Sequence, residues 1–131
     1  MDNSLKDLSD RRNFPRIDAT VLVRHLFYYY AKPQTPPGES DAYTKNIGGG
    51  GIMFETDVFA PSDAFAELEI HLPNLSIPIQ TIAKIVWVQD IKHNETEKKY
   101  RMGASFLEIG EDDRNTLIDF IQSNTPKKDR T

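Results

Sequence analysis

The sequence has no cysteine among its 131 residues, which excludes a disulfide scaffold, a thiolate metal site and a cysteine nucleophile. It also lacks a long apolar run. The most apolar stretches, around residues 21–31 and 82–88, are interrupted by charged or histidine residues and are shorter than the roughly 18 residues of a membrane span. The first residues contain no apolar segment of a secretory signal. We therefore expect a cytoplasmic protein without a membrane span.

An excess of positive charge is also missing, because 16 Lys plus Arg stand against 20 Asp plus Glu, for a net charge of -4. Duplex nucleic acid and anionic membranes both require a positive face, so we expect neither as a partner. The length and a hydrophobic content of 38% indicate one globular domain with its own core. A local basic cluster in such a protein can still bind a small anion.

The chain divides into three parts: a charged leader at 1–18, a body at 19–123 and a polar tail at 124–131. Within the body, β-branched and aromatic residues in alternation predict six strands, and an acidic first turn followed by an apolar stripe predicts one helix at 111–123. The strands are expected at 19–30, 42–47, 51–56, 65–72, 77–90 and 100–107. Because strands and helices do not alternate, the fold class is a mainly β, antiparallel barrel or strongly curled sheet with a C-terminal helix.

Alternation in the strand at 77–90 assigns its side chains to two faces. Ile79, Ala83, Ile85 and Trp87 fall on one face, so Trp87 is interpreted as a core residue. The three histidines, His25, His71 and His93, lack the close spacing of a metal site. No serine lies in a nucleophile elbow and no buried carboxylate pair is evident, so an enzyme is not expected.

The first candidate binding feature is a basic cluster, Arg11, Arg12 and Arg16, at the entry to the first strand. A guanidinium both forks onto phosphate oxygens and stacks on flat π systems. A ligand with phosphates and aromatic bases would use both properties. The alternative is a solvated basic turn paired with Asp10 and Asp18.

The second feature is a run of four glycines, 48–51, preceded by Asn46. Such a run at a strand junction indicates either unusual φ angles or a close approach of the backbone to something else. Successive N–H groups in the turn can form a nest for an anion. The run is neither a Walker loop nor a dinucleotide fingerprint, since no Lys-Ser/Thr and no helix follow. A flexible hairpin turn is the alternative.

Together the two features resemble the PilZ domain family. Arg12 and Arg16 form an Arg-x-x-x-Arg pair directly before the first strand, and an Asn-x-x-x-x-Gly turn from Asn46 to Gly51 joins the next two strands. The resemblance covers about residues 10–123, including the strands around 51–55, 67–70, 82–88 and 100–107 and the helix after them.

The resemblance implies a six-stranded antiparallel β-barrel that acts as a bacterial receptor for cyclic di-GMP (c-di-GMP). By analogy with the family, Arg12 and Arg16 grip phosphate and guanine, and Asn46 and Gly51 match the first and last positions of the second motif. Gly48 stands where that motif usually has serine, so one hydrogen bond is lost, worth roughly 0.5–1.5 kcal/mol. Arg11 adds a third guanidinium and favours an intercalated nucleotide dimer. No cofactor is implied.

We expect ligand binding to fold the leader against the barrel and to relay the signal to an effector protein in trans. The family associates such relays with motility, exopolysaccharide output, biofilm and virulence. One rival hypothesis is a ligand-blind PilZ-like module that only binds another protein. A second is a single-strand nucleic-acid binder that uses Tyr28, Tyr29 and Tyr30 as a stacking platform.

Overall fold

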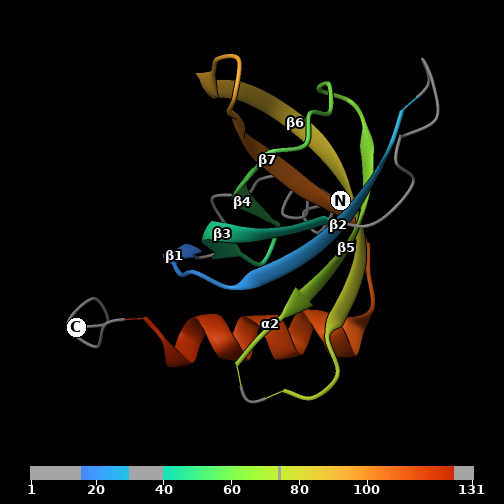
Figure 1. The fold of residues 1–131 in the computed structure, drawn as a ribbon. Coiled ribbons are helices and arrows are strands. Elements are labelled where there is room, and N and C mark those ends of the chain that lie inside the picture. The colour runs from blue at the N-terminus through green and yellow to red at the C-terminus, as the bar shows by residue number, and fades with distance from the viewer. Residues whose placement is uncertain (1–15, 30–39, 74, 126–131) are drawn as a thin grey trace.

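The computed structural model describes residues 16–29, 40–73 and 75–125. Within these ranges the chain forms strands and one helix, α2 (Glu111–Ser123) (Figure 1). The strands are β1 (Arg16–Asp18), β2 (Leu22–Tyr28), β3 (Ser40–Gly48), β4 (Gly51–Thr56), β5 (Phe65–His71), β6 (Ile79–His93) and β7 (Lys98–Ile109).

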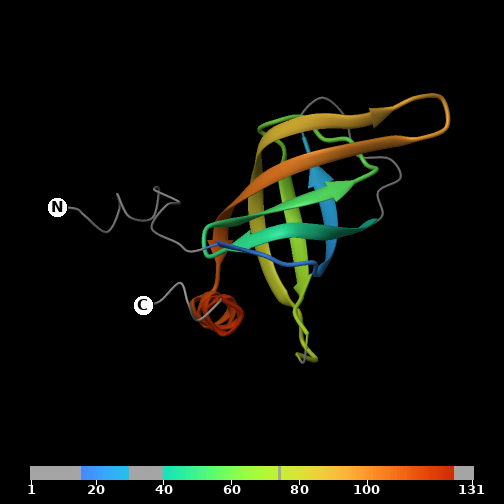
Figure 2. The same ribbon diagram turned by 90° about the vertical axis from the view of Figure 1, so that its left-hand side faces the viewer.

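Six of the strands close into an antiparallel barrel. Their order is β3-β2-β5-β6-β7-β4, and pairing of β4 with β3 completes the ring. The short β1 pairs with residues 46–48 of β3, and β2 pairs with residues 40–43 of the same strand. The expected six-stranded barrel is therefore confirmed. The structure adds β1, which lies within the segment that the sequence assigned to the leader (Figure 2).

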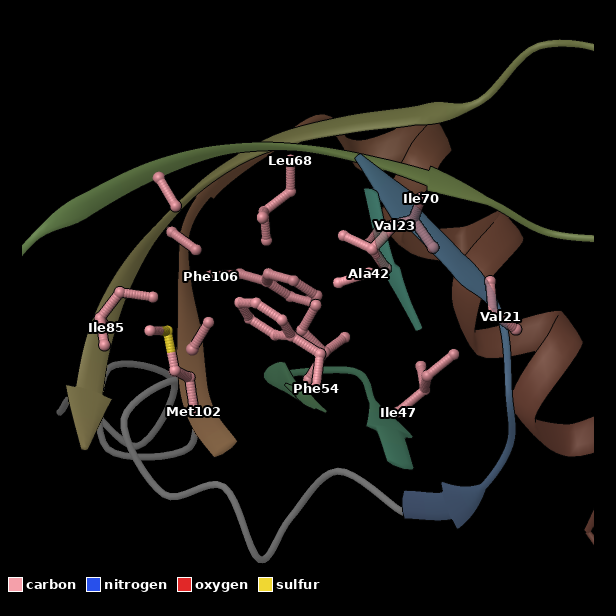
Figure 3. Close-up of a cluster of buried hydrophobic side chains, with 14 of the residues drawn as sticks. Val21, Val23, Ala42, Ile47, Phe54, Leu68, Ile70, Ile85, Met102 and Phe106 are labelled. Carbon is pink, nitrogen blue, oxygen red and sulfur yellow. The ribbon is translucent and has the colours of Figure 1, made fainter. Parts of the chain in front are cut away.

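The core fills the barrel interior, because residues along the strands point alternately inward and outward, except where a bulge shifts the register. On β5, Ala66, Leu68 and Ile70 are buried, and on β7, Tyr100, Met102, Ala104 and Phe106 are buried, as the alternation predicts. Phe54, Leu68 and Met102 belong to the cluster of buried side chains that Figure 3 shows. Burial of each such large side chain contributes about 1.5–3 kcal/mol to folding.

The prediction that Trp87 lies in the core is wrong. Strand β6 has a β-bulge between Ile85 and Trp87, so that the inward residue Ile85 is followed by a shift in register. Trp87 is consequently 37% exposed on the outer face. Simple alternation does not count the extra residue of a bulge, which is why the sequence placed this side chain inside.

Helix α2 runs past one end of the barrel (Figures 1 and 2). Three acidic residues in its first turn complement the positive end of the helix dipole, and Leu117 and Ile121 are buried. Its predicted span, 111–123, is confirmed, and it contacts β3 and β6. Among the described residues, no helix has the length and apolar character needed to cross a membrane.

Candidate functional site

Strand β1 places Arg16 directly opposite Gly48. Its three residues alternate between exposed, buried and exposed, so that Ile17 anchors the strand against the core while Arg16 and Asp18 face outward. The pairing register with β3 sets Arg16 across from Gly48 and Asp18 across from Asn46. Two candidate motifs that lie about 30 residues apart in the sequence are thereby joined by one ladder.

The side chains of Arg16 and Asn46 bond directly to each other. The Asn46 Oδ1 atom accepts hydrogen bonds from Arg16 Nε at 3.2 Å and from Arg16 Nη2 at 2.5 Å. The Asn46 amide nitrogen lies 3.9 Å from the sulfur of Met53 on the neighbouring strand β4. These contacts hold the exposed, planar guanidinium at a fixed place beside the glycine turn.

The glycine turn is a two-residue connection between β3 and β4. Gly48 pairs with Gly51, and Gly49 and Gly50 form the loop. Of the two explanations that the glycine run allowed, the structure supports close approach, because no described glycine has positive φ. A β-carbon on Gly51 would lie 2.1 Å from the carbonyl oxygen of Ala104 on β7. Gly51 is therefore required by the spacing of the barrel backbone.

The outer face continues from Asn46 toward an exposed indole. In cross-strand register, Asn46 pairs with Met53, Met53 with Gly103, and Gly103 with Trp87. A β-carbon on Gly103 would lie 2.2 Å from the indole Nε1 of Trp87, so the missing side chain makes room for the ring. Alternation in the sequence does not reveal Trp87 as a surface residue, although a glycine inside a strand, here Gly103, is the signal of such a close approach.

The structure brings together four of the six predicted site residues: Arg16, Asn46, Gly48 and Gly51. The other two, Arg11 and Arg12, lie outside the described residues. Among the described residues, no group of three or more His, Asp and Glu side chains is arranged to hold a metal ion. The site is thus a cationic and amide-lined patch suited to an anion with hydrogen-bonding edges.

His25 takes no part in this patch. Its ring lies inside the barrel, bonds to the Thr56 hydroxyl at 2.9 Å and stacks on Phe27 with centroids 4.4 Å apart. Burial lowers the pKa of His25 to about 4, and the negative charges of Asp57 and Asp41 offset this only in part. The imidazole is therefore neutral near pH 7 and serves packing.

Solved structures with the same fold include three bacterial proteins. The Bacillus subtilis inhibitor of motility, MotI/DgrA, matches with a TM-score of 0.65 and 24% identity over 87% of this chain and 51% of its own. The PilZ domain of Escherichia coli YcgR with c-di-GMP matches with a TM-score of 0.62 and 13% identity, over 87% of this chain and 91% of its own. The K. pneumonia MrkH–c-di-GMP complex matches with a TM-score of 0.64 and 17% identity, over 92% of this chain and 55% of its own.

The chain spans about half the length of MotI and MrkH, so the comparison with those two proteins concerns one part of each. No curated protein is similar enough in sequence to count as a match. The family model of the PilZ domain matches residues 10–123, which include the barrel, the arginine cluster and helix α2. The chain therefore belongs to the PilZ domain family.

Proposed function

We propose that this protein is a c-di-GMP receptor. The observation that carries the proposal is the placement of Arg16, which lies opposite Gly48 and is bonded to Asn46 on the outside of the barrel. The solved YcgR PilZ domain and MrkH complex contain c-di-GMP, and both share this fold. Membership of the family and a preformed cationic patch at the matching motifs support the same ligand here.

Each site residue has a chemical role in this proposal. The Arg16 guanidinium donates to a phosphate oxygen or to the Hoogsteen edge of guanine, which presents the N7 and O6 acceptors. Asn46 orients the guanidinium and offers its own amide to the ligand. Backbone N–H groups of the glycine turn supply further donors. Arg11 and Arg12, outside the described residues, are proposed to add contacts to phosphate and to a second guanine.

Trp87 extends the proposed binding surface. It lies three strand positions from Asn46 in the ring, a path of roughly 14 Å along the curved sheet at about 4.8 Å a strand. A partly exposed indole is a stacking surface for a base. A ligand that reached both residues would have to be larger than one guanine, as an intercalated nucleotide dimer is.

The proposed output is a signal passed to a protein partner. The MotI structure is described as that of an inhibitor of motility, and motility or biofilm control is the process we propose for this chain. Binding of nucleotide at β1 and β3 changes the surface that a cytoplasmic effector reads. The barrel would then act as an adaptor without chemistry of its own.

Isothermal titration with c-di-GMP tests the receptor function, with cyclic GMP and cyclic di-AMP as matched nucleotides. We expect saturable binding of c-di-GMP that is at least tenfold tighter than binding of the other two. Saturation at two nucleotides per chain supports the intercalated dimer, and saturation at one removes it. Absence of c-di-GMP binding would overturn the proposal and leave the ligand-blind module.

A further inference from the structure

The glycine turn is held from behind by two hydrogen bonds to its carbonyl groups. The Gly49 carbonyl accepts a bond of 2.8 Å from the Arg114 Nη1 atom on α2. The Gly50 carbonyl accepts one of 2.9 Å from the backbone N–H of Phe106 on β7. Arg114 lies 65 positions from Gly49 in the sequence and belongs to no motif that pointed to the site.

The dihedral angles of the turn show why it needs such support. A two-residue hairpin loop favours turn types I′ and II′, whose twist matches that of the strands. Both types, and type II as well, require a positive φ, and no described glycine has one. The loop of Gly49 and Gly50 therefore lacks the positive φ that an unsupported hairpin prefers, and a type I-like arrangement fits this restriction.

Glycine does not by itself select this arrangement. Types I and II differ by a flip of the central peptide, here the bond between Gly49 and Gly50, and type II places the second loop residue at φ near +80°. Gly50 adopts that angle at no steric cost. The contact that distinguishes the two orientations is the bond to Arg114, because a flip turns the Gly49 carbonyl away from α2.

The orientation of this peptide decides where its donor points. In a trans peptide the carbonyl and the following N–H point in opposite directions. With the Gly49 carbonyl held toward α2, the Gly50 N–H faces away from the helix. We propose that Arg114 is a positioning residue that fixes the Gly50 N–H as a donor for the anionic ligand, an inference that rests on the proposed c-di-GMP site.

The same bond links the ligand turn to helix α2. Ligand held by the Gly50 N–H favours the peptide orientation that bonds to Arg114. A partner that binds Arg114 and removes it from the turn therefore weakens ligand binding, and the ligand weakens binding of that partner by the same factor. The helix thereby becomes part of the output of the site, although none of its residues faces the ligand in this proposal.

The first test uses the protein without ligand. We expect the Gly50 amide to give one sharp signal in nitrogen–proton NMR spectra of the parent, and exchange broadening or a second signal in Arg114→Gln. The matched control is Asn115→Ala, which changes an exposed neighbour on the same helix. An unchanged Gly50 signal in Arg114→Gln would overturn the positioning role, whether or not the parent binds c-di-GMP.

The second test measures c-di-GMP binding and a rescue. We expect Arg114→Gln to bind up to about tenfold more weakly, since only the fraction of turns in the competent orientation binds. Alanine at position 50 disfavours the positive φ of the flipped turn, so Gly50→Ala alone serves as the reference for the double variant. We expect Arg114→Gln to weaken c-di-GMP binding much less in the Gly50→Ala background than in the parent. An equal loss of affinity in both backgrounds would show that Arg114 acts only through general stability.

Discussion

The inside of the barrel and its outer face at β1 and β3 are built on opposite principles. Inside, His25, Phe27 and Phe54 are almost fully buried, and the Phe27 ring stacks on the other two. Outside, an exposed Arg16 is bonded to a partly exposed Asn46 on the surface of the sheet. The comparison teaches that substitutions inside should change stability, whereas substitutions outside should change ligand binding and leave stability nearly intact.

The largest expected effect comes from acid acting on the interior. The pKa of His25 is lowered to about 4 in the folded protein, so between pH 4 and 6.5 the unfolded chain binds more protons than the folded one. The free energy of unfolding should therefore fall as the pH decreases through this window, by up to about 3 kcal/mol. Urea unfolding at pH 7, 5.5 and 4.5 measures the loss.

Carboxylates also titrate in this range. The contribution of His25 is therefore the difference between the parent and His25→Gln in the slope of unfolding free energy against pH. His25→Gln keeps a polar group beside Thr56 but has no ring to protonate, and it should flatten the dependence on pH. The matched control is His93→Gln, which changes an exposed histidine and should leave the slope as it is in the parent. Equal slopes for the parent and His25→Gln would contradict the assignment.

Gly51→Ala tests a residue that belongs to both regions. Because the new β-carbon would lie 2.1 Å from the Ala104 carbonyl oxygen, β4 and β7 must move apart. We expect a loss of about 2 kcal/mol in stability, typical of overpacking, together with weaker c-di-GMP binding. Gly110→Ala is the control, since nothing lies within 4 Å of its added carbon. Thermal melting that is equally unaffected in both variants would contradict the close approach.

Arg16→Ala sharpens the comparison from the outer side. Loss of charge-assisted bonds should weaken c-di-GMP binding by about 1.5 kcal/mol, or more than tenfold, with nearly unchanged melting. Arg12→Ala is expected to act similarly. Arg24→Ala removes a partly exposed arginine that is bonded to Asp41 at the opposite end of β3 from Asn46, and it should leave binding unaltered. Binding by both motif variants at parental affinity would refute the site assignment.

Gly48→Ser has the smallest expected effect, and it is a gain. Gly48 lies opposite Arg16 and does not have positive φ, so serine fits the backbone without left-handed strain. The added hydroxyl should tighten c-di-GMP binding by up to about tenfold at unchanged melting temperature. Weaker binding combined with lower melting would instead show that the turn requires glycine at this position.

The sequence predicts the barrel well because its signals are local. Strict alternation marks β5 and β7, and the acidic start of α2 marks its first residue. The position of Trp87 could not be predicted, because the bulge in β6 depends on pairing with β7, which the sequence of one strand does not reveal. The bond from Arg114 to Gly49 could not be predicted for the same reason, since only the closed barrel brings α2 beside the turn.

The contact between Gly51 and the Ala104 carbonyl also bears on how sequences of this family are interpreted. A glycine that the barrel backbone itself requires will be retained in a family member that no longer binds the nucleotide, because folding alone selects for it. Its presence in a relative is thus evidence of the fold. If the proposed function holds, retention or loss of Arg16 and Asn46, whose side chains lie outside the core, separates receptors from ligand-blind barrels.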